Sequence, residues 1–401
     1  GASAGEQLTS GIQNTLIGGT AGDALTAADF NVALGYAALS ADTLGSRSIA
    51  IGRGALLAQN FTTATDTYNT AVGHFAGGSV TTGIVNTLIG GLSGDAITTG
   101  NDNTALGYGS LSANTASNRN TAIGSATLQS FNVTTDTHTY NTAVGYGAGN
   151  VVTTGTQNTL VGGLAADAVT TGSENTALGQ AALGQDTAGN KTVAVGNGAL
   201  ATQNFTTSTD SYNVGIGYTA GLSVTTGVRN TLIGALAGDA LTDADSNVAV
   251  GTNALGADTL GSKSIAIGQG SLFLQNFTTA TDSHNIAIGH EAGLNVSTGV
   301  QNTLIGGLAG DALTTSTGNV AVGYQALTSE DTGQYNTAIG WTALANADNN
   351  SDNYNTAVGA AAGQAVTNGV QNTLIGGLAG DALTTGGENV AVGAFALSGE
   401  D

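Results

Sequence analysis

The sequence predicts an all-β protein built as a parallel β-solenoid of about 22 coils, each 17–21 residues long. Three observations predict this fold. A five-residue core recurs along the whole chain, its side chains alternate in type, and the 401 residues include 64 Gly but no Pro. Gly at this density is unfavourable in helices, and a strand with neighbours on both sides needs every backbone N–H, which Pro lacks.

The core reads Asn, then Thr, Val or Ile, then Ala, Leu or Gly, then Ile, Leu or Val, then Gly. Its closing glycines recur after 17 or 21 residues, as at Gly35, Gly52 and Gly73, and one step of 19 residues ends at Gly359. Three short steps and one long step make a super-repeat of 72 residues, starting near residues 14, 86, 158, 230, 302 and 372. We therefore expect residues 1–401 to form one repetitive domain, with both ends cut within the array.

The alternation within the core predicts a short strand with two different faces. Val32 and Leu34 share one face and Ala33 lies on the other, because side chains along a strand point alternately to opposite sides. We expect the face with Ala and Leu to form an exposed apolar stripe, which favours lateral association of three copies around a common axis. The stripe leucines are Leu16, Leu88, Leu160, Leu232, Leu304 and Leu374.

Stacked coils place equivalent residues above one another, about 4.8 Å apart. The Asn that opens most cores then forms a ladder, in which side-chain amides hydrogen-bond along the axis. The closing Gly is expected to need a positive φ or a close approach to a neighbouring backbone. The ladder residues of the six super-repeats are Asn14, Asn86, Asn158, Asn230, Asn302 and Asn372, with Gly18, Gly90, Gly162, Gly234, Gly306 and Gly376.

Composition argues against several classes of function. Acidic residues outnumber basic ones by 27 to 6, and the resulting net charge of −21 argues against binding nucleic acid or an anionic membrane surface. There is no Cys for disulfides or thiolate chemistry, and no apolar run is long enough to span a bilayer as a helix. No catalytic arrangement of Ser, His or paired carboxylates stands out. The sequence therefore predicts no enzyme, no cofactor and no metal centre.

The long steps carry an insertion, QNFTTATD at residues 59–66, that recurs in later super-repeats. We expect it to form protruding turns, and exposed loops on a rigid scaffold are where binding usually resides. The candidate ligand contacts are Phe61, Asp66, Phe205, Asp210, Phe277 and Asp282. The alternative is that each Phe only packs its loop onto the solenoid.

A second set of acidic residues occurs once in each super-repeat, mostly within the string GDAL. Its members are Asp23, Asp95, Asp167, Asp239, Asp311 and Asp381. Turn capping is one interpretation and cation binding is the other. Because Ca²⁺ takes six to eight oxygen ligands and four coils separate successive members, no two of these carboxylates are expected to share one ion.

The strings SIAIGRGAL at residues 48–56, SIAIGQGSL at 264–272 and TVAVGNGAL at 192–200 resemble the head repeat of YadA-like trimeric autotransporter adhesins. Similar repeats occur in bacteriophage tail fibres. The resemblance implies a left-handed parallel β-roll that trimerises side by side. The coils here are longer than the usual turn of that family, and most cores begin with Asn-Thr rather than Ser-Val or Ser-Ile.

Together these observations predict an extracellular structural fibre or adhesin shaft, a rigid spacer that presents a binding tip at a bacterial surface. A bacteriophage tail fibre for host attachment is the alternative. A further alternative is an ice-binding solenoid, because Thr pairs such as Thr81-Thr82 and Thr153-Thr154 are expected to form flat rows. The expected partners are further copies of the chain and a cell-surface receptor or glycan, with no nucleic acid and no membrane insertion.

Overall fold

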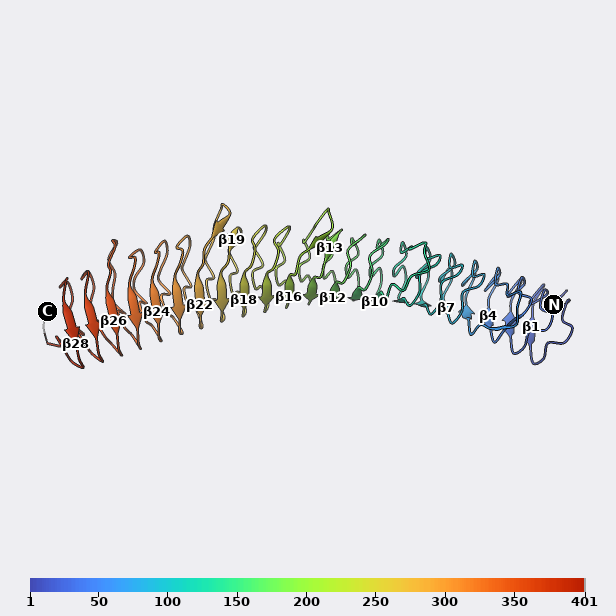
Figure 1. Ribbon diagram of the computed structural model, residues 1–401, viewed down its shortest axis with the longest axis horizontal. Helices are drawn as coiled ribbons and strands as arrows, with labels where there is room; N and C mark the ends of the chain where they lie inside the picture. The colour runs from blue at the N-terminus through green and yellow to red at the C-terminus, as the bar shows by residue number, and fades with distance from the viewer. Residues whose placement is uncertain (400–401) are drawn as a thin grey trace. The chain divides into compact units, whose positions relative to one another are not determined.

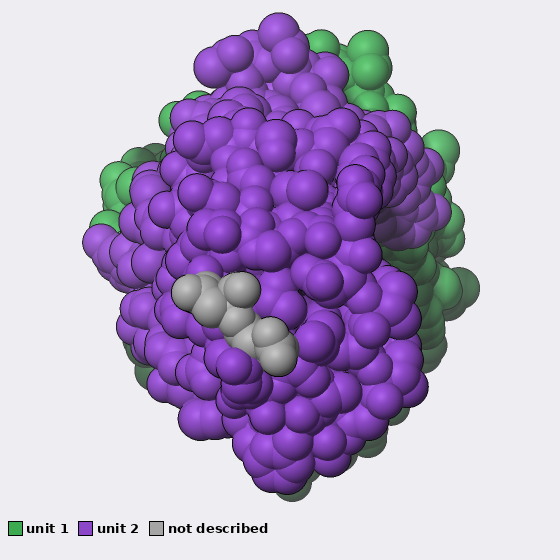
Figure 2. Space-filling view, turned by 90° about the vertical axis from the view of Figure 1, so that its left-hand side faces the viewer, with its two compact units in different colours: residues 1–197, 204–210 green, residues 198–203, 211–401 purple. Residues whose placement is uncertain are grey.

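The computed structural model describes residues 1–399, which contain strands and turns but no helix. They form a parallel β-solenoid of about 22 coils, so the all-β prediction is confirmed. The described residues divide into two compact units, which Figure 2 colours separately. Unit 1 comprises residues 1–197 and 204–210, and unit 2 comprises residues 198–203 and those from 211 onward.

Unit 1 carries one strand of three residues in each coil, and neighbouring coils pair these strands in parallel. The strands are β1 (Thr15–Ile17), β2 (Val32–Leu34), β4 (Ile49–Ile51), β6 (Thr70–Val72), β7 (Thr87–Ile89), β8 (Thr104–Leu106), β9 (Thr121–Ile123), β10 (Thr142–Val144), β11 (Thr159–Val161), β12 (Thr176–Leu178) and β14 (Val193–Val195). Two further pairs of short strands join β3 (Gly45–Ser46) to β5 (Thr65–Asp66) and β13 (Gly189–Asn190) to β15 (Thr209–Asp210).

Unit 2 follows the same plan, and Figure 1 shows its strand arrows side by side, one in each coil. Its strands are β16 (Val214–Ile216), β17 (Thr231–Ile233), β18 (Val248–Val250), β20 (Ile265–Ile267), β22 (Ile286–Ile288), β23 (Thr303–Ile305), β24 (Val320–Val322), β25 (Thr337–Ile339), β26 (Thr356–Val358), β27 (Thr373–Ile375) and β28 (Val390–Val392). One pair of short strands joins β19 (Gly261–Ser262) to β21 (Thr281–Asp282).

The middle residue of each strand points into the coil. In the pair β23–β24, Leu304 lies opposite Ala321, and both are fully buried. Ile305, the third residue of β23, is 36% exposed. The predicted alternation is therefore confirmed, but the outward face is the one with Thr, Val and Ile.

The expectation of an exposed leucine stripe is wrong. Leu16 is half-buried, and the other five stripe leucines, Leu88, Leu160, Leu232, Leu304 and Leu374, are buried inside the coils. The reason is space. Most coils are so narrow that only Ala fits, and Leu88 fits because a Cβ added at Gly77 or Gly94 would stand 2.7 Å from its methyl groups. The glycines of the recurring GLAGDAL string thus make room for the core leucine.

The Asn ladder forms, but its hydrogen bonds run mainly to the backbone. Asn86 donates its backbone N–H to Oδ1 of Asn69 in the preceding coil at 2.9 Å. Its Nδ2 donates to the carbonyl of Gly100 in the following coil, also at 2.9 Å. A direct amide-to-amide bond from Asn86 Nδ2 to Asn69 Oδ1 is longer, at 3.3 Å. Asn86 therefore connects three coils, and both polar atoms of its side chain are satisfied without water.

The closing glycine meets both requirements expected of it. Gly107 has φ +139°, and a Cβ there would stand 2.3 Å from the carbonyl oxygen of Gly124 in the next coil. No side chain tolerates that distance to a backbone atom. Gly is thus required here for the close approach of successive coils as well as for the backbone conformation.

Candidate functional site

The long coils carry the inserted segments in which the sequence analysis predicted ligand contacts. We call each of these segments an arm. Figure 1 shows the arms at β13 and β19 extending beyond the turns of their neighbouring coils. Unit 1 contains an arm at residues 42–69 and another at 114–141, and unit 2 contains arms at 258–285 and 330–355.

The phenylalanines of the arms do not face solvent. Phe61, Phe205 and Phe277 are only 8%, 6% and 5% exposed. Thr43 Oγ1 donates to the carbonyl of Phe61 at 2.7 Å, and the Phe61 N–H donates to a buried carboxylate of the preceding coil. These three residues were predicted to contact a ligand, and that prediction is wrong because each ring packs its arm onto the solenoid.

The first arm contains a fully buried carboxylate, Asp42. Its Oδ1 accepts hydrogen bonds from the backbone N–H groups of Gly45 at 3.1 Å and Phe61 at 3.0 Å. Its Oδ2 accepts one from Gln59 Nε2 at 2.6 Å. Gln59 also donates to Ser48 Oγ at 2.8 Å and accepts from Nδ2 of the ladder residue Asn69 at 2.9 Å. The carboxylate thus closes a network that joins the arm to the Asn ladder.

The same network recurs in unit 2. Asp258 Oδ1 accepts from Gly261 and Phe277, and its Oδ2 accepts from Gln275 Nε2 at 2.6 Å. Burial raises the pKa of Asp258 above its ordinary value, and the hydrogen bond from Gln275 opposes that shift. A carboxylate enclosed in this way stabilises the arm and is closed to any ligand.

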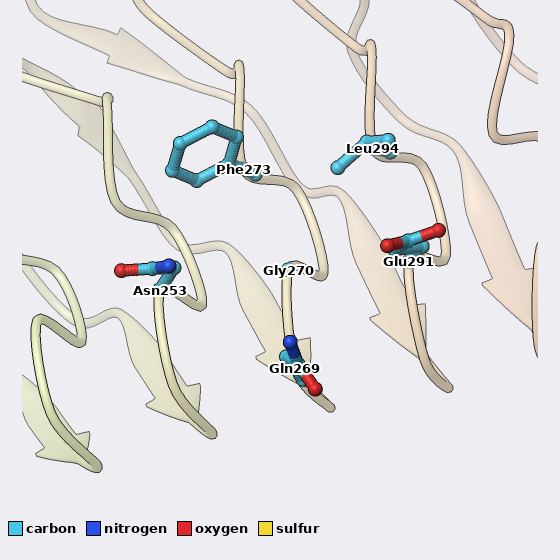
Figure 3. Close-up of a pocket in the computed structure, with 6 residues that line it drawn as sticks. All are labelled: Asn253, Gln269, Gly270, Phe273, Glu291 and Leu294. Carbon is cyan, nitrogen blue, oxygen red and sulfur yellow. The ribbon is translucent and has the colours of Figure 1, made fainter.

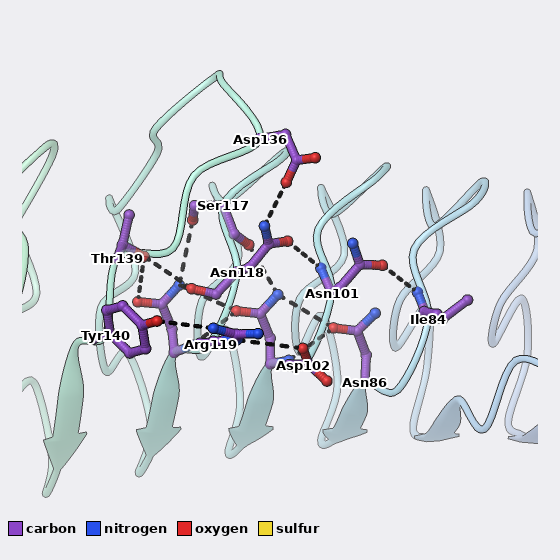
Figure 4. Close-up of polar contacts among 12 residues, drawn as sticks. Ile84, Asn86, Asn101, Asp102, Ser117, Asn118, Arg119, Asp136, Thr139 and Tyr140 are labelled. Atoms are coloured by element: carbon purple, nitrogen blue, oxygen red, sulfur yellow. Dashed lines mark hydrogen bonds and ion pairs between the residues drawn. The ribbon is translucent and has the colours of Figure 1, made fainter.

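The arm at 114–141 fills the same place differently. Asn114 replaces the acid and bonds locally to Ser117, through Ser117 N–H to Asn114 Oδ1 at 3.2 Å and Asn114 Nδ2 to Ser117 carbonyl at 3.1 Å. Phe131 stands where the first arm has Gln59, and it is fully buried. Figure 4 shows polar contacts of this arm and the neighbouring coils, including Asn118 Nδ2 donating to Asp136 Oδ1 at 2.5 Å.

The last arm uses a longer acid. Glu330 is fully buried, and its Oε1 accepts from the Gly333 N–H at 2.7 Å while its Oε2 accepts from Asn353 Nδ2 at 2.7 Å. Burial raises the pKa of Glu330, and the charges of Asp331 and Asp348 raise it further. These three acids are the only cluster of possible metal ligands found in residues 1–399. The inward hydrogen bonds of Glu330 give it a structural role.

The aspartates predicted to contact a ligand are exposed but already paired. Asp66 Oδ2 lies 2.8 Å from Nη1 of Arg47, and Asp210 Oδ2 lies 2.6 Å from Nζ of Lys191. Asp282 is paired with Lys263 in the same way. Arg47 also donates to the Tyr68 hydroxyl at 2.7 Å and lies over the Phe30 ring at 5.5 Å from its centroid.

Sequence reasoning missed the basic partners of the exposed aspartates and the buried acids of the arms, although the spacing of each set was a signal. The basic residues Arg47, Arg119, Lys191 and Lys263 recur every 72 residues in a chain that has only six bases. The buried positions recur at the same interval, as Asp42, Asn114, Asp186, Asp258 and Glu330. Either spacing indicates one column of equivalent positions.

The GDAL acids stay apart from one another, as the spacing predicted. Burial raises the pKa of Asp95, whose Oδ1 has no hydrogen-bond partner in residues 1–399. Asp311 differs because Thr328 Oγ1 donates to its Oδ1. In the Thr pairs considered for ice binding, the first hydroxyl is used internally. Thr81 Oγ1 donates to the Thr98 carbonyl and Thr153 Oγ1 to the Thr170 carbonyl, both at 3.1 Å.

The outward face of the strands is an extended apolar feature of each unit. Its third strand position carries Ile, Leu or Val in every coil, and many of these side chains are more than a third exposed. In unit 1 they include Ile17, Leu34, Leu106 and Leu178, and in unit 2 Ile216, Ile233, Ile288, Ile305, Ile339 and Ile375. The first position is Thr, Val or Ile, so the face is apolar or weakly polar throughout.

Residues 1–399 hold no helix with the length and apolarity needed to cross a membrane. Comparison of the chain with protein-family models and with curated protein sequences found no match in either. The resemblance carried by the three strings therefore stays a prediction.

Proposed function

We propose that this chain is a non-enzymatic structural segment of an extracellular fibre, in which copies pack side by side through the outward face of their strands. The observation that carries the proposal is the column of exposed Ile, Leu and Val side chains at the third strand position. Contiguous apolar surface on a protein marks an interaction site. Such a row of equivalent side chains can pack against the same row on a second copy of the chain.

The interior of each unit supports the role of a stiff spacer. Within each unit, successive coils are joined by strand pairing, in most coils by a ladder Asn, and by the close approach of closing glycines. The arms add a further connection. Gln59 donates to Asp42 and accepts from the ladder residue Asn69, and so links the arm to the Asn ladder. Solenoids of this kind gain stability from every neighbouring pair of coils.

Three copies around a common axis, in the arrangement implied by the strings at 48–56, 192–200 and 264–272, is the assembly we propose. The net charge of −21 favours a limited assembly, because repulsion opposes further bundling of completed trimers. The role at a bacterial surface is that of an adhesin shaft.

The test is the subunit stoichiometry of the purified protein, measured by native mass spectrometry and sedimentation at micromolar concentration. We expect three copies. A variant with Ile288→Glu and Ile305→Glu, on the paired strands β22 and β23, places charge on the outward face and is expected to be a folded monomer.

The matched control carries Gln301→Glu and Gln371→Glu, which add the same charge at exposed positions outside the strands. This control is expected to stay trimeric. A monodisperse wild-type monomer would overturn the proposal, and a trimeric Ile variant would exclude the strand face as the interface.

A further inference from the structure

A cavity of about 240 Å³ lies in unit 1, at the corner where three successive coils leave their strands. Its lining residues are Tyr36, Ala37, Arg53, Gly54, Leu57 and Phe75. The space exists because residue 54 is Gly, with φ +65°, and a Cβ there would stand 2.6 Å from the Phe75 ring. A side chain at position 54 would displace the Phe75 ring, which forms one wall of the cavity.

Arg53 is the feature that gives this cavity a chemistry. Four of the six basic side chains of the chain, Arg47, Arg119, Lys191 and Lys263, form ion pairs with aspartates. Within residues 1–399, no carboxylate lies at ion-pair distance from Arg53. Its Nη1 donates to Nε2 of His74 at 3.2 Å, and its Cζ lies 5.2 Å from the centroid of the Phe75 ring. The remaining guanidinium donors suit a carboxylate, which accepts two of them in parallel.

The other walls of the cavity are apolar and aromatic. Tyr36 is largely exposed, while Leu57 and Phe75 are half-buried. The Phe75 ring is held edge-on against His74, with 4.7 Å between the ring centroids. Ligand pockets combine such walls with a few placed polar groups, and those for drug-sized ligands measure roughly 300–1,000 Å³. This cavity is smaller and suits a single ring that has apolar faces.

We propose that this cavity binds one carboxylated sugar ring, with the carboxylate on Arg53 and the ring faces against Tyr36 and Phe75. The net charge of −21 repels a polyanion, so the ligand carries its negative charge at one point, where the unpaired guanidinium is. The inference does not depend on the assembly proposed above, because all lining residues belong to one chain.

Unit 2 holds an internal comparison. A cavity of about 220 Å³ lies at the equivalent place, 216 residues further along, and Figure 3 shows its lining residues Asn253, Gln269, Gly270, Phe273, Glu291 and Leu294. Gln269 replaces Arg53, and Glu291 replaces Phe75. The backbone cavity is therefore kept, while its charge is reversed. We expect the carboxylated sugar to be rejected there.

The test compares two probes that differ only at C6, methyl β-glucuronide and methyl β-glucoside, by saturation-transfer NMR at millimolar concentration. With the full chain we expect the glucuronide to bind at least about tenfold more tightly, with one site per chain. Arg53→Gln is expected to remove that preference. The control, Arg229→Gln, removes another base that no ion pair holds in residues 1–399, and it is expected to bind like the wild type.

A second variant tests gain of function. Thr252→Tyr, Gln269→Arg and Glu291→Phe together give the unit 2 cavity equivalents of Tyr36, Arg53 and Phe75. The number of glucuronide sites is then expected to rise from one to two. The proposal is overturned if the two glycosides bind alike, if neither binds, if Arg53→Gln retains the preference, or if the triple variant still has one site.

Discussion

Two arms of unit 1 occupy equivalent positions and hold themselves together by different means. The arm at 42–69 buries a polar network around Asp42 and Gln59, whereas the arm at 114–141 buries Phe131 where that glutamine lies. The first arm pairs its two sides through the strands β3 and β5, and the second pairs them through the single bridge between Asn118 and His138. An arm of this solenoid therefore needs a filled interior, and either a satisfied polar network or an aromatic ring supplies it.

A third filling, in unit 2, shows what limits these exchanges. The arm at 330–355 is two residues shorter than its equivalents, and its acid is one methylene longer. Glu330 reaches the Gly333 N–H and the Asn353 amide through that extra length. Chain length and side-chain length thus compensate, because a buried carboxylate must find all its donors.

The largest effect that we predict comes from emptying the aromatic arm. Phe131→Ala removes a fully buried ring and is expected to lower the free energy of unfolding by about 3–5 kcal/mol. The loss should be seen as faster hydrogen exchange of the arm amides, because solenoids open locally. Phe61→Ala is the control in the other arm, where the polar network remains, and we expect a smaller loss. Equal losses would show that the two arms do not differ in what holds them.

The next effect comes from giving the aromatic arm the acid of its counterpart. Asn114→Asp buries a charge beside Phe131, without the amide that Gln59 offers to Asp42, and is expected to cost about 2–3 kcal/mol at pH 7. The new carboxyl should have a pKa raised by burial. Its cost is therefore absent below about pH 4, where it is protonated in both states, and full above the raised pKa.

Unfolding in urea at pH 4 and pH 7 measures that difference. Gln157→Glu adds the same charge at an exposed position of the same unit and should show almost no cost at either pH. A cost of Asn114→Asp that is independent of pH would mean that the acid stays hydrated, and that the two arms are interchangeable.

The fold was largely predictable, because the 17-residue and 72-residue periods directly indicate which residues stack. Which strand face is inside was not. Leu88 and Ile89 are both apolar, and only the width of the coil places the leucine inside and the isoleucine outside. That width depends on Gly77 and Gly94, because the Leu88 methyl groups occupy the space that side chains at these two positions would need.

The site was less predictable, for a related reason. The arm loops carry a conspicuous Phe, but a side chain in a protruding segment packs inward wherever the segment has a core of its own. The cavity at Arg53 depends on the absence of a side chain at Gly54 and on the ring of Phe75, one coil further along. Spacing aligns such residues in columns, whereas an empty volume is a property of three packed coils together.

A smaller effect tests whether the polar network of an arm needs its charge. Asp258→Asn keeps the shape of the side chain and is expected to cost about 1 kcal/mol. Because burial raises the pKa of Asp258, its contribution to stability is full below about pH 4 and declines as the pH rises towards the raised pKa. The variant lacks that decline, so its deficit relative to wild type should shrink between pH 4 and pH 7. If the stability deficit of Asp258→Asn grows with pH, the folded protein favours the charged carboxylate of Asp258. That result would contradict a pKa raised by burial.

The smallest effect concerns the basic residue that each of the two arms of unit 1 carries. Arg47 pairs with Asp66 at 2.8 Å and stacks on two rings, whereas Arg119 lies 3.6 Å from Asp102 and stacks only on Tyr140. Exposed ion pairs contribute little, so the Gln variant at either position is expected to lower Tm by less than about 2 °C, with the larger loss at Arg47. Melting curves at low salt and at about 1 M salt separate the two contributions, because salt screens the ion pair and leaves the stacking. If the variants become equal at high salt, the ion pair accounts for the difference between the arms. If the difference persists, the additional ring contact of Arg47 accounts for it, and a larger loss at Arg119 would contradict both explanations.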